Sequence, residues 1–278
     1  MLYVVATPIG NREDLTRRAQ RILDEVACIF CEDTRHSGKL LAELGIDTPR
    51  LSLHEHNERA RIDTVLQRLQ NGESCALISD AGTPLINDPG FVLVRALRDA
   101  GMRVVPVPGA SAVIAALSAA GLPADRFSYE GFLPAKSKAR RDRLAALAND
   151  SRTLVFYEAP HRLEEMLADA ANAFGAERLA CVAREITKLH EEFRNGTLAE
   201  LCEWAARDPN ATRGEIVVVV GGASSESTAQ RLYADEVLRA LLEELPASKA
   251  AKVASKLTGE RRQALYQRAL ELSGGAAE

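Results

Sequence analysis

The chain has 278 residues, of which 46% are hydrophobic and 27% charged, and its formal net charge is −4. This length accommodates two domains of ordinary size and an appendage, and the negative balance argues against nucleic-acid binding driven by overall charge. The apolar stretches are too short to span a bilayer, and five cysteines without framework spacing are typical of a reducing compartment. We therefore expect a cytoplasmic protein without a membrane segment.

The first 122 residues alternate between strand-like runs and amphipathic stretches. This alternation predicts a mainly parallel sheet with helices on both faces. Gly121-Leu122-Pro123 interrupts the pattern, and we place a domain boundary there. The strands are expected near 3–6, 27–31, 51–53, 75–79 and 103–107, and the helices near 15–26, 35–44, 58–71, 91–100 and 110–120.

Two residue pairs in this part suggest a metal site at first sight. Cys28 and Cys31 lie three positions apart, so on a strand they face opposite sides and cannot share a metal. His54 and His56 would face one way, but no third ligand stands nearby. We interpret them as an exposed strand end and expect no metal.

A second alternating series predicts another α/β domain over 123–222. After it, GGASSES (221–227) reads as a flexible linker. A helical tail follows within 223–278, broken at Pro246 and near Gly259. The strands of the second domain are expected near 127–131, 153–157, 179–184 and 215–220, and its helices near 138–148, 162–174 and 198–207.

Three loops rich in Gly and Pro follow strands of the first series, at 7–11, 79–90 and 106–111. Ligands of open α/β sheets bind outside the carboxyl ends of the strands, and Gly allows backbone to approach a ligand closely. Any one of these loops could simply be a turn. Three of them, one twelve residues long, predict a ligand site.

The loops lack both the dinucleotide fingerprint and the Walker motif, and 79–90 contains no Lys for a phosphate. A neutral-to-zwitterionic, nucleoside-like ligand held by backbone groups fits this composition. S-adenosylmethionine is one such ligand, but the loops alone do not name it.

The segments TPIGN, Ser79–Pro84 and Pro108–Ala112 resemble the cofactor loops of the tetrapyrrole methylase superfamily of S-adenosylmethionine-dependent methyltransferases. Six motifs in order over 2–222 are more similar to its branch that methylates the ribose 2′-hydroxyl of a cytidine in the decoding region of 16S ribosomal RNA. Thr83, where tetrapyrrole enzymes usually have Asp, and Asn11-Arg12-Glu13 depart from the tetrapyrrole pattern. The motifs are ATPIGNREDLT, CEDTRHSGKLL, LISDAGTPLINDPG, EGFLPAKSKAR, FYEAPHRL and REITKLHEEFRNGTL.

The resemblance implies two α/β domains with the cofactor cleft between them, a homodimer, and 16S rRNA within the small ribosomal subunit as partner. It also implies a set of S-adenosylmethionine contacts, in which Asp80 either bonds a polar part of the cofactor or caps a turn. The expected contacts are Pro8, Asp80, Gly82, Thr83, Ile86, Ser111 and Ala112, with Tyr157 and Gly214 from the second domain.

Methyl transfer to a hydroxyl requires alignment of donor and acceptor and a base for the hydroxyl proton. A sulfonium already activates its methyl group, so no metal is needed. Each candidate base could instead form a structural ion pair or a helix cap. The candidates are Glu158 and His161 in YEAPHR and Glu185 and Lys188 in REITK, with Glu32 and Asp33 as alternatives.

The segment KSKARRDR (136–143) concentrates five cations and predicts a phosphate-binding surface. A solvated helix start is the alternative, although cations there oppose the helix dipole. In the tail, three lysines share a helical face and, with two arginines beyond, either bind RNA or keep a small bundle soluble. The expected RNA contacts are Lys136, Lys138, Arg140, Arg141 and Arg143, with Arg35 and His36; the tail cations are Lys249, Lys252, Lys256, Arg261 and Arg262.

Two other functions stay open on the sequence. A tetrapyrrole C-methyltransferase would need neither the basic segment nor the helical tail. A non-catalytic module would bind cofactor and RNA without transferring a methyl group.

Overall fold

The computed structural model describes residues 1–260 and 262–274, so Arg261 lies outside the described residues. The chain divides into two compact units. The first contains Met1–Gly121 with Val182–Arg194 and Gly214–Val217, and the second contains Leu122–Cys181, Asn195–Arg213 and the chain from Val218. Among the described residues, no helix is long and apolar enough to cross a membrane.

The first sheet has five strands in the order β3-β2-β4-β1-β5, and all neighbours are parallel. The predicted alternation of strands and helices is confirmed. The strands are β1 (Leu2–Val5), β2 (Cys28–Cys31), β3 (Arg50–Ser52), β4 (Cys75–Ile78) and β5 (Val104–Val107), and the helices are α1 (Arg17–Glu25), α2 (Thr34–Glu43), α3 (Glu58–Gln70), α4 (Phe91–Asp99) and α5 (Ala112–Ala119).

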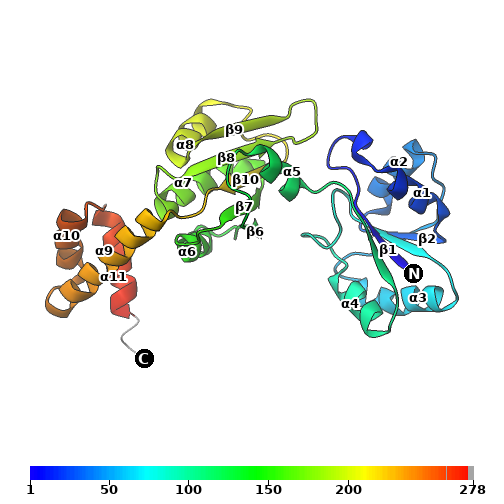
Figure 1. Ribbon diagram of the computed structural model, residues 1–278, viewed down its shortest axis with the longest axis horizontal. Helices are drawn as coiled ribbons and strands as arrows, with labels where there is room; N and C mark the ends of the chain where they lie inside the picture. Colours follow the sequence, from blue (N-terminus) through cyan, green and yellow to red (C-terminus); the bar gives the residue numbers. More distant parts are fainter. Residues whose placement is uncertain (261, 275–278) are drawn as a thin grey trace. The chain divides into compact units, whose positions relative to one another are not determined.

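Helices cover both faces of this sheet (Figure 1). Leu23 of α1 and Leu41 of α2 pack on one face, in a cluster that includes Cys31. Leu69 of α3 and Leu97 of α4 pack on the other, in a cluster that includes Cys28. Adjacent positions of a strand point to opposite faces, so the two thiols are separated by the sheet, as predicted.

The second sheet also has five strands, in the order β6-β7-β10-β8-β9. The sequence did not predict β9, because EFRNGT is polar and the strand lies half-exposed at the sheet edge. The strands are β6 (Phe127–Phe132), β7 (Thr153–Glu158), β8 (Leu179–Arg184), β9 (Glu192–Thr197) and β10 (Ile216–Val220), and the helices are α6 (Ser137–Leu147), α7 (Leu163–Phe174) and α8 (Leu198–Arg207).

Residues 221–223, at the start of the predicted linker 221–227, are held by backbone hydrogen bonds. The N–H of Gly221 donates to Leu179 O at 2.9 Å, and the N–H of Ala223 donates to Asp150 O at 2.7 Å. A Cβ at Gly222 would lie 2.0 Å from Ser151 O, so glycine permits close backbone contact there rather than flexibility.

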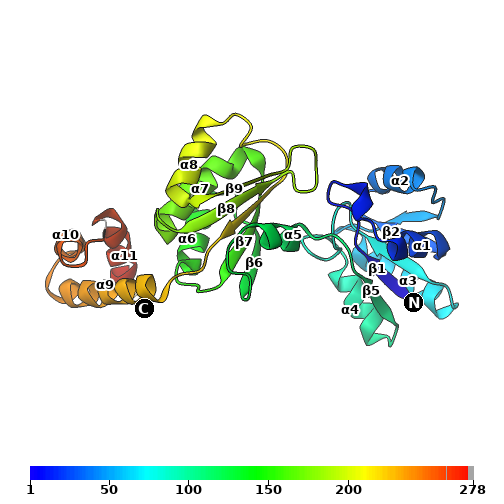
Figure 2. The ribbon, with the colours of Figure 1, turned by 45° about the horizontal axis from the view of Figure 1, so that its top comes forward.

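The tail forms three helices, α9 (Ser225–Glu244), α10 (Ala247–Thr258) and α11 (Arg262–Gly274), around a core of its own (Figure 2). Pro246 precedes α10, and Gly259 in the left-handed conformation ends it. The core is built from Ala234, Leu238, Ala250, Ala251, Ala254, Leu265 and Ala269.

Candidate active site

The three Gly/Pro loops are joined by hydrogen bonds at the carboxyl ends of β1, β4 and β5. Thr7 and Gly82 exchange two backbone hydrogen bonds of 2.9 and 3.0 Å. Ser79 Oγ donates to Gly82 O at 2.9 Å, and Thr83 Oγ1 donates to Ala110 O at 2.9 Å. Thr83 therefore fixes the third loop against the second.

Unusual backbone conformations gather in two segments near these strand ends. Among the described residues other than glycine, only Leu85, Asn87, Glu185 and Thr187 have positive φ. Two of them lie in the 79–90 loop and two in REITK. Such conformations are costly and tend to occur at functional sites.

Acidic side chains follow the neighbouring strands β2 and β4. Burial, with the charges of Glu32 and Asp80, raises the pKa of Asp88 to about 6. Burial, with the charge of Asp80, also raises the pKa of Glu32. These carboxylates would attract a positively charged ligand. The sequence reasoning missed Asp88, although it stands in the same Gly/Pro loop.

Asp80 accepts a hydrogen bond of 3.3 Å from the backbone N–H of Asp33. Asp33 itself caps α2, because its Oδ1 accepts from the N–H groups of Arg35 and His36 at 2.7 and 3.3 Å. This role as a helix cap explains Asp33 without catalysis. Arg35 and His36 are exposed on the first turn of α2.

Glu185 and Lys188, two of the four candidate bases, form an ion pair. Lys188 Nζ lies 2.8 Å from Glu185 Oε1 and 3.1 Å from Glu215 Oε2. The hydrogen bond from Lys188, then that from the N–H of Glu215, lowers the pKa of Glu185. Burial opposes the charge of Lys188, but its bonds to both carboxylates outweigh burial and raise its pKa. Gly214 packs against this pair, because a Cβ there would lie 2.4 Å from Glu185 Cδ.

This ion pair lies beside the first Gly/Pro loop, within the same compact unit. The N–H of Asn11 donates to Thr187 Oγ1 at 3.1 Å. A Cβ at Gly10 would lie 2.5 Å from Lys188 Cγ, so only glycine allows this approach. Two segments some 176 positions apart in the chain thus meet at the candidate site.

Glu158, another candidate base, is enclosed in the second unit. Its Oε1 lies 3.2 Å from Arg162 Nε and accepts from the N–H of Ala159 at 2.8 Å. Burial raises the pKa of Glu158, and those two partners offset part of the shift. Arg162 Nη2 in turn donates to Leu133 O and Pro134 O at 2.7 and 3.2 Å. Through Arg162, Glu158 therefore stabilises the loop that precedes the basic segment.

The other two predicted residues of the YEAPHR region differ in exposure. His161 is exposed in a short 3₁₀ turn, Pro160–Arg162. The ring of Tyr157 packs edge-to-face on Tyr129 and Phe132, with centroids 5.0 and 5.6 Å apart. Both residues belong to the second unit.

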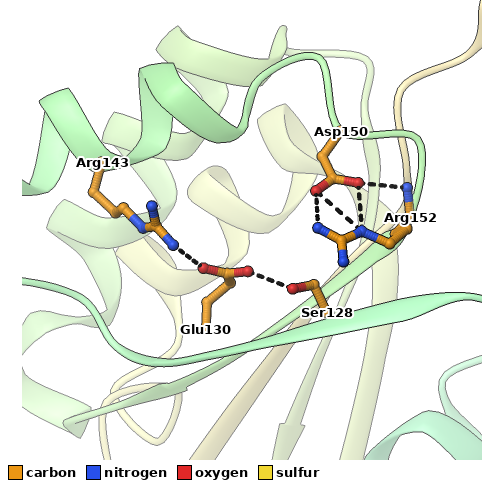
Figure 3. A network of polar contacts seen from close by, with 5 residues as sticks. All are labelled: Ser128, Glu130, Arg143, Asp150 and Arg152. Atoms are coloured by element: carbon orange, nitrogen blue, oxygen red, sulfur yellow. Dashed lines mark hydrogen bonds and ion pairs between the residues drawn. The ribbon is translucent and has the colours of Figure 1, made fainter.

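The basic segment is only partly available to a partner. Arg140 is 2% exposed, and its guanidinium bonds Asp169 at 2.7 Å and Glu165 at 2.9 Å. The expectation that Arg140 contacts RNA is therefore wrong, because its charge is neutralised in the interior. Arg143 bonds Glu130 at 2.5 Å, and Glu130 also accepts from Ser128 (Figure 3). The segment residues that remain exposed are Lys136, Lys138, Arg141 and Arg143.

The chain is similar to known methyltransferases. Residues 1–202 match the family described as Tetrapyrrole (Corrin/Porphyrin) Methylases, and residues 228–273 match the RsmI C-terminal HTH domain. A Pseudomonas aeruginosa protein is 56% identical over 275 residues, covering 98% of both chains, and an Escherichia coli O157:H7 protein is 50% identical over 273 residues, covering 98% of this chain and 96% of the other. Both are named ribosomal RNA small subunit methyltransferase I.

Solved structures with lower identity share the fold. A cobalamin biosynthetic enzyme, cobalt precorrin-4 methyltransferase, is 17% identical with a TM-score of 0.60, over 79% of this chain and 94% of the other. A uroporphyrin-III C-methyltransferase from Thermus thermophilus, complexed with S-adenyl homocysteine, is 19% identical with a TM-score of 0.54, over 79% of this chain and 96% of the other.

Proposed function

This chain belongs to the tetrapyrrole methylase family, and from that premise we propose that it transfers a methyl group from S-adenosylmethionine to the ribose 2′-hydroxyl of a cytidine in the decoding region of 16S rRNA. The observation that carries the proposal is 56% identity, over 98% of both chains, to a protein named ribosomal RNA small subunit methyltransferase I. The six ordered motifs support the choice of the ribose hydroxyl.

The chemistry of the 79–90 loop fits S-adenosylmethionine, whose sulfonium supplies an activated methyl group. Asp80 and Asp88 supply negative charge for a cationic ligand, and no Lys or Arg stands between Ser79 and Gly90. Gly82, at φ +79°, presents backbone where a side chain would be strained. The proposed cofactor residues are Pro8, Asp80, Gly82, Thr83, Ile86, Ser111 and Ala112, with Tyr157 and Gly214, and we add Asp88.

Glu185 is the proposed proton acceptor for the ribose hydroxyl. Its lowered pKa keeps it ionised at neutral pH. Its Oε1 accepts hydrogen bonds from Lys188 Nζ and from the N–H of Glu215, while its Oε2 has no hydrogen-bond partner among the described residues. Lys188, protonated at neutral pH, positions this carboxylate rather than accepting a proton. His161 remains an alternative acceptor.

The substrate RNA is proposed to contact exposed cations in two places, the basic segment and the start of α2. Lys136, Lys138 and Arg141 are exposed, and Arg143 is half-exposed beside Glu130. Arg35 and His36 extend from α2. The assembled small ribosomal subunit is the proposed substrate, since a decoding-region site is formed within it.

The protein is further proposed to act as a cytoplasmic homodimer. Phe127 and Phe132 on the edge strand β6 are 39% and 52% exposed, and a partner would remove them from water. Light scattering on the purified protein tests this, and a monomer mass at micromolar concentration would contradict it.

The function is tested with methyl-labelled S-adenosylmethionine and small ribosomal subunits from cells that lack this protein. Label on a single cytidine ribose of 16S rRNA is the expected result. Label on a base, or on an added porphyrinoid instead of RNA, would contradict the proposal. Cofactor binding without any labelled product would indicate a non-catalytic module.

A further inference from the structure

Helix α10 presents three lysines on one exposed side. Lys249, Lys252 and Lys256 are spaced by three and four positions and therefore lie on one helical face. All three are exposed, whereas Ala250, Ala251 and Ala254 on the same helix are buried in the tail core. We call these three residues the α10 lysine face.

The charge of this face is not compensated locally. Helix α10, with the sequence ASKAAKVASKLT, contains no Asp or Glu. None of the three lysines makes an ion pair with the part of the chain that the structure describes. Their concentration on a single helix contrasts with a net charge of −4 for the whole chain.

Helix α11 has one exposed cation, Arg262 at its start, and one cation paired within the tail, Arg268. In helix-turn-helix proteins the second helix of the pair usually contacts the nucleic acid, which here would be α11, after the short turn at Gly259. Arg268 of α11, however, pairs within the tail with Asp235 and Glu260. Its charge therefore serves the packing of the three helices rather than an outside partner.

We infer that the α10 lysine face binds phosphates of the substrate RNA, an inference that rests on the proposed function. Ammonium groups on flexible stems bind phosphate as point charges and impose little sequence preference. Seven positions of α-helix extend about 10 Å, so the face can reach successive phosphates of one strand. The tail thereby adds affinity for ribosomal RNA without contributing to methyl transfer.

The test compares the full-length triple variant K249Q/K252Q/K256Q with the wild type in fluorescence anisotropy on 16S rRNA transcripts, from 50 to 300 mM KCl and without cofactor. Loss of three phosphate contacts should make the slope of log affinity against log salt less negative by about 2. K249R/K252R/K256R should restore the slope. The matched control R17Q/R18Q/R95Q removes the same charge from exposed residues of α1 and α4 and should not change it.

An unchanged salt slope in the triple Gln variant, with normal helix content by circular dichroism, would overturn the inference. Loss of binding to intact small subunits but not to protein-free 16S rRNA would indicate contact with a ribosomal protein and would also overturn it. Because binding is measured without methyl transfer, an inactive wild-type protein would count against the proposed function alone. With an active protein, the variant should raise KM for the subunit and leave kcat within about twofold.

Discussion

Lys188 Nζ lies 2.8 Å from Glu185 Oε1, and the stem of Lys188 packs against Gly10 of the first Gly/Pro loop. The pair thus couples a carboxylate near the candidate site to the backbone of that loop. Both residues were candidate bases on the sequence, but the pKa of one is lowered and that of the other raised by their contact. The two residues therefore have different proposed roles, Glu185 as the proton acceptor and Lys188 as the residue that positions it.

The variant K188Q should lower kcat/KM for methyl transfer by about tenfold, because it removes the charge-assisted hydrogen bond between the partly exposed side chains of Lys188 and Glu185. The raised pKa of Lys188 keeps it charged throughout pH 6.5–9.5, so the shape of the pH–rate profile should not change. Steady-state kinetics over that range check both points. If Lys188 were the base, wild-type activity would rise steadily with pH and K188Q would abolish the rise; K188R should retain most of the activity.

Cofactor binding should depend on the backbone at Gly82. G82R introduces a side chain at φ +79°, with Ile9 Cγ2 3.3 Å from the Cβ position, and should abolish binding of S-adenosylmethionine in calorimetry. The matched control is G72R, because Gly72 has φ +85° and no atom within 4 Å of its Cβ position. Both variants should lose about 1–2 kcal/mol of stability from backbone strain. Equal cofactor affinity in the two variants would refute the assignment of this loop.

Asp88 should make both cofactor affinity and stability depend on pH. Its pKa of about 6 lies above the ordinary 3.8, so the folded chain holds this proton more tightly than the unfolded chain. The free energy of unfolding should therefore fall as pH rises from about 4 to 6. D88N should remove that fall and raise the melting temperature of the cofactor-free protein at pH 7.

The same substitution should weaken S-adenosylmethionine binding at pH 7.5, since the ionised carboxylate attracts a cationic ligand. Wild-type affinity should decrease as pH drops below 6, and the affinity of D88N should be less dependent on pH. Asp80, in the same loop, accepts a hydrogen bond from the N–H of Asp33. The cofactor affinity of D80N therefore provides a comparison with that of D88N. Tighter binding by D88N at neutral pH would contradict an electrostatic role.

Strand and helix periodicity predicted most of the fold, because helices bury both faces of the first sheet and four of its five strands are continuous apolar runs, β3 (RLS) being the exception. Strand β9 was missed, since an exposed edge strand carries no such pattern. The approach of Asp88 to Glu32 could not be predicted either. It depends on β2 and β4 being neighbours in a sheet whose order does not follow the chain.

In the basic segment, the number of cations alone does not predict which of them are exposed, and Arg140 is the example. Arg140 shares a helical stripe with Leu144 and Leu147, and that stripe is buried. The spacing of these three residues indicates a buried helical face, whereas the density of cations in the segment favours an exposed one. A charged residue at an apolar position of a helix more often signals an internal ion pair, here with Asp169 and Glu165.

Glu158 should prove to be a structural residue rather than the base. E158Q leaves the Arg162 guanidinium without its carboxylate and should cost about 1–3 kcal/mol of stability. At a temperature where the variant remains folded, kcat with saturating subunits should stay within about threefold of wild type. Loss of a general base would reduce kcat by about 100-fold or more, so single-turnover rates distinguish the two roles.

The basic segment should separate into residues that bind RNA and one that holds the fold. Lys136, Lys138 and Arg141 are exposed, and K136Q/K138Q/R141Q should weaken RNA binding and make its salt slope less negative by about 2, with an unchanged melting temperature.

R140Q, in contrast, should lower the stability of the fold and leave the salt slope of RNA binding unchanged. It breaks a buried ion pair with Asp169 and should cost about 3–5 kcal/mol of stability, while the salt slope of the protein that remains folded is preserved. The substituted residues lie on α6 or, for Lys136, at its N-cap. Anisotropy and thermal unfolding of both variants therefore decide whether this segment binds RNA through its exposed face. An unaltered salt slope in the triple variant would remove the segment from the RNA-binding surface.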